Sequence, residues 1–212
     1  MTGAMREPWA PPPAPHADVT PRLAATVALV RPAPGGDLEV LLTRRPATMR
    51  FAADVHVFPG GAVDDADGDP HFVERLDLAP DEAALRLGGD LDPAVAAAVH
   101  VAAIRELAEE AGVLLVEPAV DEASLHTAQA AIAAGRSFPD ILGVLDQVLG
   151  ARVRLAGRAL RPLSRWVTPP LLPRRFDARF FVALLPAGSR LSFAHDEVVD
   201  HRWVRPREAL NG

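Results

Sequence analysis

The chain has 212 residues, enough for one domain with insertions or two small domains, and its 49% hydrophobic and 24% charged residues are typical of a soluble globular protein. It contains no cysteine and no lysine, which excludes disulfide scaffolds, thiolate catalysis, zinc–cysteine sites and lysine Schiff bases. The net charge of −6 disfavours a general nucleic-acid binder, and no apolar run reaches the roughly 18–20 residues of a membrane span.

The first 22 residues are rich in proline and lack the continuous apolar stretch of a signal peptide. We therefore expect residues 1–22 to form a disordered leader on a cytoplasmic protein. No linker divides residues 23–212, so we expect them to form a single domain.

The next segments predict strands. Two apolar runs, 25–31 and 38–43, flank the turn sequence Pro-Gly-Gly-Asp and predict a β-hairpin. A short strand at 55–58 runs into Gly60 and Gly61, where the missing side chains permit close approach of the backbone.

The acidic segment 64–92 has the composition of an insertion. We expect a solvated loop with a short helix near 81–87, and the alternative is a lid over a binding site. The pattern from Pro93 predicts a long helix that ends at Gly112. A buried strand at 113–116, helices at 122–134 and 140–149, and strands at 176–185 and 198–204 follow. This alternation predicts an α/β fold with a mixed sheet.

The long helix carries the string Arg-Glu-Leu-Ala-Glu-Glu-Ala-Gly-Val at 105–113. Glu106, Glu109 and Glu110 are spaced i, i+3 and i+4, so they share one face, and the apolar residues lie on a separate stripe. Three carboxylates repel each other unless cations lie among them, and their oxygens suit Mg²⁺ or Mn²⁺. The alternative is a solvated helix on which Arg105 and Glu109 form an ordinary ion pair.

Together with Phe-Pro-Gly-Gly at 58–61, this string resembles the signature of the Nudix family. That signature is a glycine, five residues, a glutamate, seven residues, and then Arg-Glu-apolar-any-Glu-Glu-any-Gly-apolar. The second half is complete at 105–113. The first glutamate falls at Asp67 when counted from Gly61 and at Ala97 when counted back from Arg105, because an insertion splits the box.

The split box and the strings at 165–169 and 174–181 are similar to the coenzyme A diphosphatase branch of the family. The resemblance covers roughly residues 25–210 and implies a Nudix-type α/β/α sandwich with a mixed sheet and an insertion inside the box. It also implies roles for the residues of the box: divalent metal held by Glu106, Glu109 and Glu110, catalysis by Glu106 as general base with Arg105 and Glu109, and backbone contact with the diphosphate at Gly60 and Gly61.

Further substrate ligands are suggested by weaker patterns. The segment 41–61 is similar to a coenzyme A-directed motif and points to Arg45 and Arg50 as phosphate ligands, with solvated strand-end charges as the alternative. Arg175 is another substrate candidate, against a simple sheet-edge charge. Glu197, before the last strand, is a candidate additional carboxylate.

The remaining large or titratable side chains have structural interpretations. We expect Trp166 and Trp203 to pack in the core, because large aromatic side chains usually do so. The histidines show no metal-ligand spacing among themselves.

We therefore expect a metal-dependent hydrolase that cleaves a nucleoside diphosphate linked to another group, with coenzyme A or acyl-coenzyme A as the leading substrate. An ADP-sugar or NADH is the alternative substrate, and a non-catalytic nucleotide-sensing module is the alternative class. We expect no nucleic-acid or membrane partner, and a homodimer is left open. The helix predicted from Pro206 stops at Gly212, which suggests a truncated C-terminal helix.

Overall fold

The computed structural model describes residues 19–44, 55–193 and 198–209, so Arg45, Arg50 and Glu197 lie outside the described residues. Residues 1–18 of the predicted leader lie outside them as well. Strand β1 begins at Arg22, the last residue assigned to that leader. Among the helices of the described ranges, none combines the length and the apolar character needed to cross a membrane.

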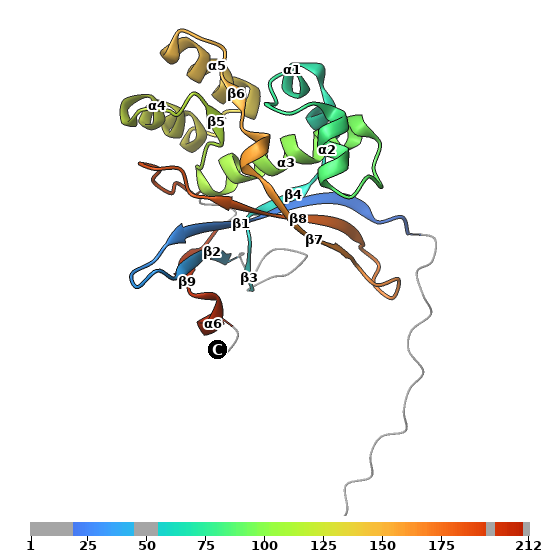
Figure 1. Ribbon diagram of the computed structural model, residues 1–212. Helices are drawn as coiled ribbons and strands as arrows, with labels where there is room; N and C mark the ends of the chain where they lie inside the picture. The colour runs from blue at the N-terminus through green and yellow to red at the C-terminus, as the bar shows by residue number, and fades with distance from the viewer. Residues whose placement is uncertain (1–18, 45–54, 194–197, 210–212) are drawn as a thin grey trace, which may run out of the picture.

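A mixed sheet forms the centre of the fold (Figure 1). Its strand order is β3 (His56–Val57), β2 (Leu38–Arg44), β1 (Arg22–Pro32), β8 (Phe176–Leu184) and β7 (Arg161–Val167), while β4 (Gly60–Ala62) pairs with β1 and β9 (Asp200–Val204) pairs with β2. The β1–β8 pair is parallel, and the other pairs of this sheet are antiparallel. The predicted hairpin and the mixed α/β fold are thereby confirmed.

The helices gather on one side of this sheet, and the short α6 (Pro206–Ala209) lies on the other (Figure 1). In chain order they are the 3-10 helix η1 (Asp65–Gly68), α1 (Pro70–Val73), α2 (Pro80–Arg86), α3 (Pro93–Ala111), α4 (Glu122–Ala133) and α5 (Phe138–Leu149). A small sheet of β5 (Val116–Glu117) and β6 (Arg154–Leu155), followed by the 3-10 helix η2 (Gly157–Ala159), joins this layer. The helices predicted at 122–134 and 140–149 are α4 and α5.

Helix α3 is the central element of the helical layer and packs against β1 and β4. Asp92 caps its N-terminus by accepting a hydrogen bond from the Ala94 N–H at 2.9 Å, and Pro93 occupies the first turn. Gly112 ends the helix in the left-handed conformation, with φ of 66°. Its apolar stripe is fully buried, as the sequence predicts: Ile104, Leu107 and Ala111.

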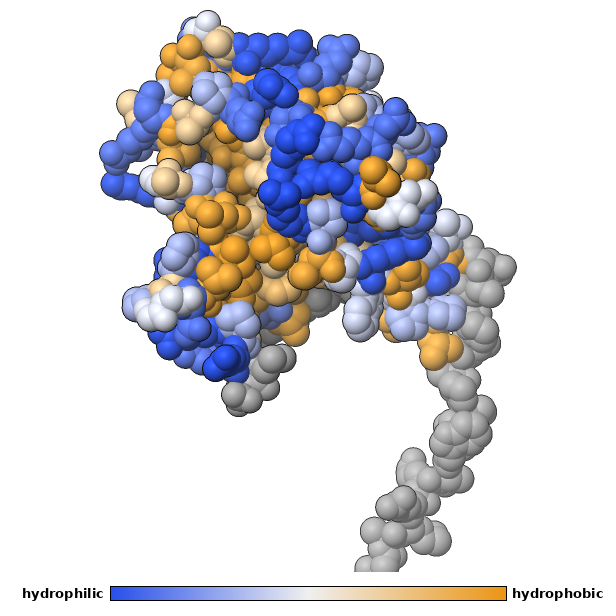
Figure 2. Space-filling view, in the orientation of Figure 1, coloured by the Kyte–Doolittle hydropathy of each residue, from blue (hydrophilic) through white to orange (hydrophobic). Residues whose placement is uncertain are grey.

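On the face drawn in Figure 2, the helical layer shows both hydrophilic and hydrophobic side chains. On the face drawn in Figure 2, hydrophobic side chains gather in the middle, between the helical layer and the β1–β2 hairpin. This arrangement agrees with a core that joins α3, α4 and α5 to the helix-facing side of the sheet.

The prediction of a solvated loop at 64–92 is wrong. This segment folds into η1, α1 and α2, and it buries Phe72, Leu76 and Leu78. Arg75, only 4% exposed, donates hydrogen bonds to both carboxylate oxygens of Asp146 on α5, at 3.0 and 2.6 Å. The insertion is therefore a packed part of the helical layer, because its apolar and charged side chains find partners far away in the sequence.

The strand predicted at 113–116 and the packing expected of Trp166 also need correction. Residues 113–116 are buried, but only the last of them enters a strand. Strand β7 was not predicted, and Trp166 within it is 68% exposed instead of packed in the core. Trp203 packs against the core as expected, although it is only half-buried, and the Arg31 guanidinium lies 4.3 Å from its ring centroid.

Candidate active site

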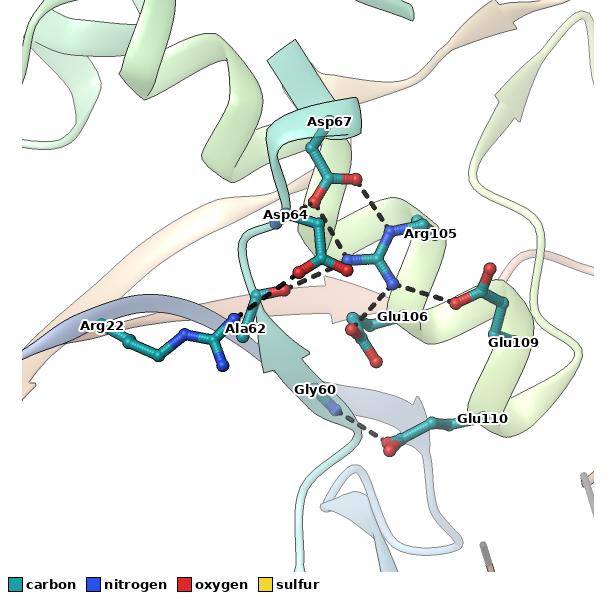
Figure 3. Close-up of polar contacts among 9 residues, drawn as sticks. All are labelled: Arg22, Gly60, Ala62, Asp64, Asp67, Arg105, Glu106, Glu109 and Glu110. Carbon is teal, nitrogen blue, oxygen red and sulfur yellow. Dashed lines mark hydrogen bonds and ion pairs between the residues drawn. The ribbon is translucent and has the colours of Figure 1, made fainter. Parts of the chain in front are cut away.

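A buried aspartate and a half-buried arginine join the insertion to α3 (Figure 3). The carboxylate of Asp67 accepts hydrogen bonds from Nε and Nη2 of Arg105 at 2.8 and 3.0 Å. The Asp67 side chain is 1% exposed and that of Arg105 is 14% exposed. Asp67 therefore supplies the carboxylate that the split box lacks, at the position found by counting from Gly61.

The local fold of η1 places Asp67 in this position. The Asp64 N–H donates to Asp67 Oδ2 at 2.8 Å, which ties the side chain to the start of the turn. Asp69 then opens α1 by accepting a hydrogen bond from the His71 N–H at 2.7 Å. The acidic composition of this stretch thus serves helix capping and one buried ion pair.

The same guanidinium also holds two of the three helix glutamates. Arg105 Nη1 donates to Glu106 Oε1 at 2.8 Å and to Glu109 Oε2 at 2.9 Å. Nη2 additionally donates to the Ala62 carbonyl on β4 at 3.2 Å. Burial alone would lower the pKa of Arg105, but the hydrogen bonds that Arg105 donates to Asp67 and the negative charges of the surrounding carboxylates outweigh it and raise that pKa above its ordinary value. Arg105 remains a cation and fixes the carboxylates around it.

The two glycines of β4 contact the carboxylates of Glu110 and Glu106. The Gly60 N–H donates to Glu110 Oε2 at 2.9 Å. Gly61 lies against Glu106 so closely that a Cβ there would overlap the carboxylate. Glycine at 61 is therefore required to leave room for Glu106, while Gly60 holds Glu110 through its main chain.

The donor chemistry of this face suits a hard divalent cation, because three carboxylates offer oxygen ligands from one side of a helix. The Glu106 side chain is 14% exposed and the Glu109 side chain is 36% exposed, so the face is partly open to solvent. Within the described residues, no three histidine, aspartate or glutamate side chains converge as a ready metal site. In this arrangement Arg105 Nη1 donates to Glu106 and Glu109, and the Gly60 N–H donates to Glu110.

Of the other predicted site residues, Arg175 lies within the described part of the chain. Its Nε donates to the Thr168 carbonyl at 3.1 Å and its Nη1 to the Val19 carbonyl at 2.7 Å. The guanidinium thus joins the segment before β1 to the turn between β7 and β8. This placement gives Arg175 a structural task at the end of the sheet.

The sequence and structure comparisons agree with this geometry. Residues 17–212 match the NUDT19 Nudix domain family, which is nearly the whole chain. The chain belongs to this Nudix family. The expected resemblance is confirmed. In this chain the ion pair between Asp67 and Arg105 joins the two halves of the split Nudix box.

Two curated relatives are longer than the part that this chain matches. The chain is 30% identical to the acyl-coenzyme A diphosphatase NUDT19 of Gallus gallus, over 89% of this chain and 62% of that protein. It is 29% identical to the protein of the same name from Homo sapiens, over 84% of this chain and 56% of that protein. The chain thus spans little more than half the length of these curated relatives.

A solved structure supports the Nudix fold directly. The crystal structure of a Nudix hydrolase from Alicyclobacillus acidocaldarius superposes with a TM-score of 0.66 at 29% identity, covering 92% of this chain and 83% of that one. Nudix hydrolases generally use divalent metals, which agrees with the carboxylate face of α3.

Proposed function

We propose that this Nudix domain hydrolyses the diphosphate of coenzyme A or acyl-coenzyme A with Mg²⁺ or Mn²⁺ as cofactor. The observation that carries the proposal is the set of three carboxylates next to Gly60 and Gly61. Arg105 donates hydrogen bonds to two of these carboxylates and is itself held by Asp67. A nucleotide-sensing module would need no such set. The names of the relatives add coenzyme A derivatives as the substrate class.

In this proposal Glu106, Glu109 and Glu110 hold the divalent ion, which supplies charge neutralisation of the diphosphate and activation of the attacking water. Arg105 orients Glu106 and Glu109, because its Nη1 donates to both. Gly60 orients Glu110 through its N–H.

The chemical step is a hydrolysis. The oxygen of water forms a bond to one phosphorus of the diphosphate, the bond from that phosphorus to the bridging oxygen breaks, and the proton of water passes to the Glu106 carboxylate. Coenzyme A would give adenosine 3′,5′-bisphosphate and 4′-phosphopantetheine. The half-buried position of Glu106 beside Gly61 suits a proton acceptor close to the substrate.

The predicted phosphate ligands Arg45 and Arg50 and the predicted carboxylate Glu197 remain parts of this proposal. All three belong to segments next to described strands: β2 ends at Arg44, and β9 begins at Asp200. They would add cationic and carboxylate groups near the diphosphate.

The test is a panel of diphosphate compounds incubated with the protein and Mg²⁺, with products identified by mass. We expect cleavage of coenzyme A or decanoyl-coenzyme A at the diphosphate, and no cleavage after metal chelation. Preferential cleavage of NADH or ADP-ribose would replace the proposed substrate. Absence of cleavage for every compound would favour the nucleotide-sensing alternative.

A further inference from the structure

The last turn of α3 has an unfavourable charge pattern. Residues 108–111 read Ala-Glu-Glu-Ala, and none of the residues of this turn is basic. The C-terminal end of a helix carries partial negative charge on its last carbonyl groups, so it attracts cations and repels carboxylates. Two of the three candidate metal ligands, Glu109 and Glu110, therefore lie on a helix end that they destabilise.

The local chain satisfies only part of this helix end. The Gly112 N–H donates to the Ala108 carbonyl at 3.0 Å, and the Val113 N–H donates to the Leu107 carbonyl at 3.3 Å. Such bonds are usual where a helix ends at a left-handed glycine. The carbonyl groups of Ala111 and Gly112 follow in the chain and take their hydrogen bonds from elsewhere.

Two distant segments supply these hydrogen bonds. The main-chain N–H of Ser192 donates to the Ala111 carbonyl at 3.0 Å. Gln129 of α4, which lies next to the C-terminal end of α3 (Figure 1), donates through Nε2 to the Gly112 carbonyl at 3.3 Å. The same Nε2 also donates to the Arg190 carbonyl. We call the Gln129 amide and the Ser192 N–H the α3 clamp.

The α3 clamp leaves no room for a side chain at position 112. A Cβ atom on Gly112 would lie 2.7 Å from Ser192 Cβ and 2.8 Å from the Ser192 carbonyl oxygen, closer than a van der Waals contact. Leu191 and Phe193, on either side of Ser192, pack against the hydrophobic core. The segment that carries Ser192 is therefore fixed against the end of α3 by packing as well as by its hydrogen bond.

The α3 clamp acts next to the glutamates. Glu109 and Glu110 are the two residues before Ala111, whose carbonyl accepts the Ser192 N–H. Glu110 also accepts the hydrogen bond from the Gly60 N–H (Figure 3). Carboxylates spaced i, i+3 and i+4 share a face only while the helix is intact. Unwinding of the last turn would thus separate the set that is needed to hold one ion.

We propose that Gln129 and the Ser192 main chain are positioning groups for the metal-binding face of α3. They keep the last turn helical, so that Glu109 and Glu110 remain on one face with Glu106. This inference rests on the metal site of the proposed function. Repulsion among the glutamates is strongest without a cation, so the clamp contributes most to the metal-free protein. Its loss should therefore weaken metal binding and leave the rate at saturating metal nearly unchanged.

Gln129→Met tests the side-chain half of the clamp, because it keeps the length of the side chain and removes the amide donor. We expect the Kd for Mn²⁺, measured from the electron paramagnetic resonance signal of the free ion, to rise about tenfold. The Mg²⁺ concentration for half-maximal cleavage of coenzyme A should rise by a similar factor, with kcat at saturating Mg²⁺ within about twofold of the parent. A lower melting temperature with an unchanged Kd would mean a merely structural role and would overturn the inference.

Gly112→Ala and Gly150→Ala form a matched pair. Both glycines end a helix in the left-handed conformation, with φ of 66° and 64°, so alanine brings similar backbone strain to each. A Cβ on Gly112 meets Ser192, whereas a Cβ on Gly150 points into open space among the described residues. The Kd for Mn²⁺ should rise at least about tenfold in Gly112→Ala and stay parental in Gly150→Ala. Equal Kd values in the two variants would contradict the proposed role of the clamp.

Ser192→Ala is the control for the main-chain half of the clamp. It retains the N–H that donates to Ala111, so the Kd for Mn²⁺ should not change. Parental Mn²⁺ binding that neither Gln129→Met nor Gly112→Ala weakens would overturn the inference alone. Clamp-dependent Mn²⁺ binding without cleavage of any diphosphate would support the inference and overturn the proposed function. A parent protein that binds no Mn²⁺ would overturn both.

Discussion

The Asp67 carboxylate and the Arg105 guanidinium form a two-point hydrogen-bonded ion pair across 38 residues of sequence. Arg105 uses its remaining donors for Glu106, Glu109 and the Ala62 carbonyl, so one cation joins the insertion, α3 and β4. The insertion that interrupts the Nudix box therefore leaves the brace between its two halves intact.

Asp67→Asn should weaken this brace. Replacing the carboxylate removes one charge-assisted acceptor of a buried guanidinium, and we expect the free energy of unfolding to fall by about 2–3 kcal/mol. Diphosphatase activity should fall at least about tenfold, because Glu106 and Glu109 lose their fixed partner. Urea unfolding and initial rates measure the two effects. Asp65→Asn, an exposed position in the same turn, is the control and should change neither.

Arg105→Lys tests whether the planar guanidinium matters beyond its charge. A lysine ammonium cannot donate to Asp67, Glu106 and Glu109 in one fixed geometry, so activity should fall well below the parent value although the charge is kept. The control is Arg152→Lys, whose side chain is 52% exposed. Parental activity in Arg105→Lys would mean that a positive charge at position 105 is enough for activity and that the planar guanidinium is not needed.

The two glycines of β4 should respond differently to alanine. In Gly61→Ala the new methyl group displaces the Glu106 side chain, which can move, so activity falls and stability changes little. In Gly60→Ala the methyl group meets the Ala25 carbonyl and the Thr26 main chain, so β4 must separate from β1 and stability falls. Thermal unfolding combined with initial rates separates the two outcomes, and equal stability losses would refute this distinction.

Acidic pH should destabilise the protein through His100. This side chain is fully buried in α3, and burial lowers its pKa below 6.5 in the folded state. The unfolded state therefore binds the proton first, and the free energy of unfolding falls as pH falls below about 6.5, by at most about 1.4 kcal/mol per pH unit. Urea unfolding between pH 5 and 7.5 measures this slope. The slope should be smaller in His100→Leu, and an identical slope would exclude His100 as its source.

The parts predicted from sequence are those with local signals. Pro93 and Gly112 mark the ends of α3, and the alternating apolar runs mark the β1–β2 hairpin, so neighbouring residues suffice to define them. The face shared by Glu106, Glu109 and Glu110 follows from helical spacing alone. The spacing from Gly61 also points to Asp67. The hydrogen bonds between its carboxylate and Arg105 cannot be predicted from spacing, because the two residues are 38 positions apart.

The parts that were missed depend on distant partners. The insertion looks like a solvated loop because its charges are visible in sequence, whereas the burial of Arg75 depends on Asp146, 71 residues away. Strand β7 contains proline and two arginines, and its pairing with β8 is irregular between Pro162 and Ser164, which hides the alternation of a strand. Trp166 is exposed because β7 is an edge strand, and the position of a strand in a sheet has no local signal.

The assignment of the α3 carboxylates as the catalytic metal site is tested most directly by measuring Mg²⁺-dependent cleavage of coenzyme A. The parent protein is compared with Glu109→Gln and Glu110→Gln. Both substitutions preserve the side-chain shape and remove a ligand charge, so the rate should fall at least about 100-fold in each. Glu109→Gln also loses an ion pair with Arg105, but the side chain is 36% exposed, so its stability should change by less than about 1 kcal/mol. Glu117→Gln, at an exposed position on β5, is the control and should keep the parental rate. Parental rates in both Glu109→Gln and Glu110→Gln would contradict the assignment of the α3 carboxylates as the catalytic metal site.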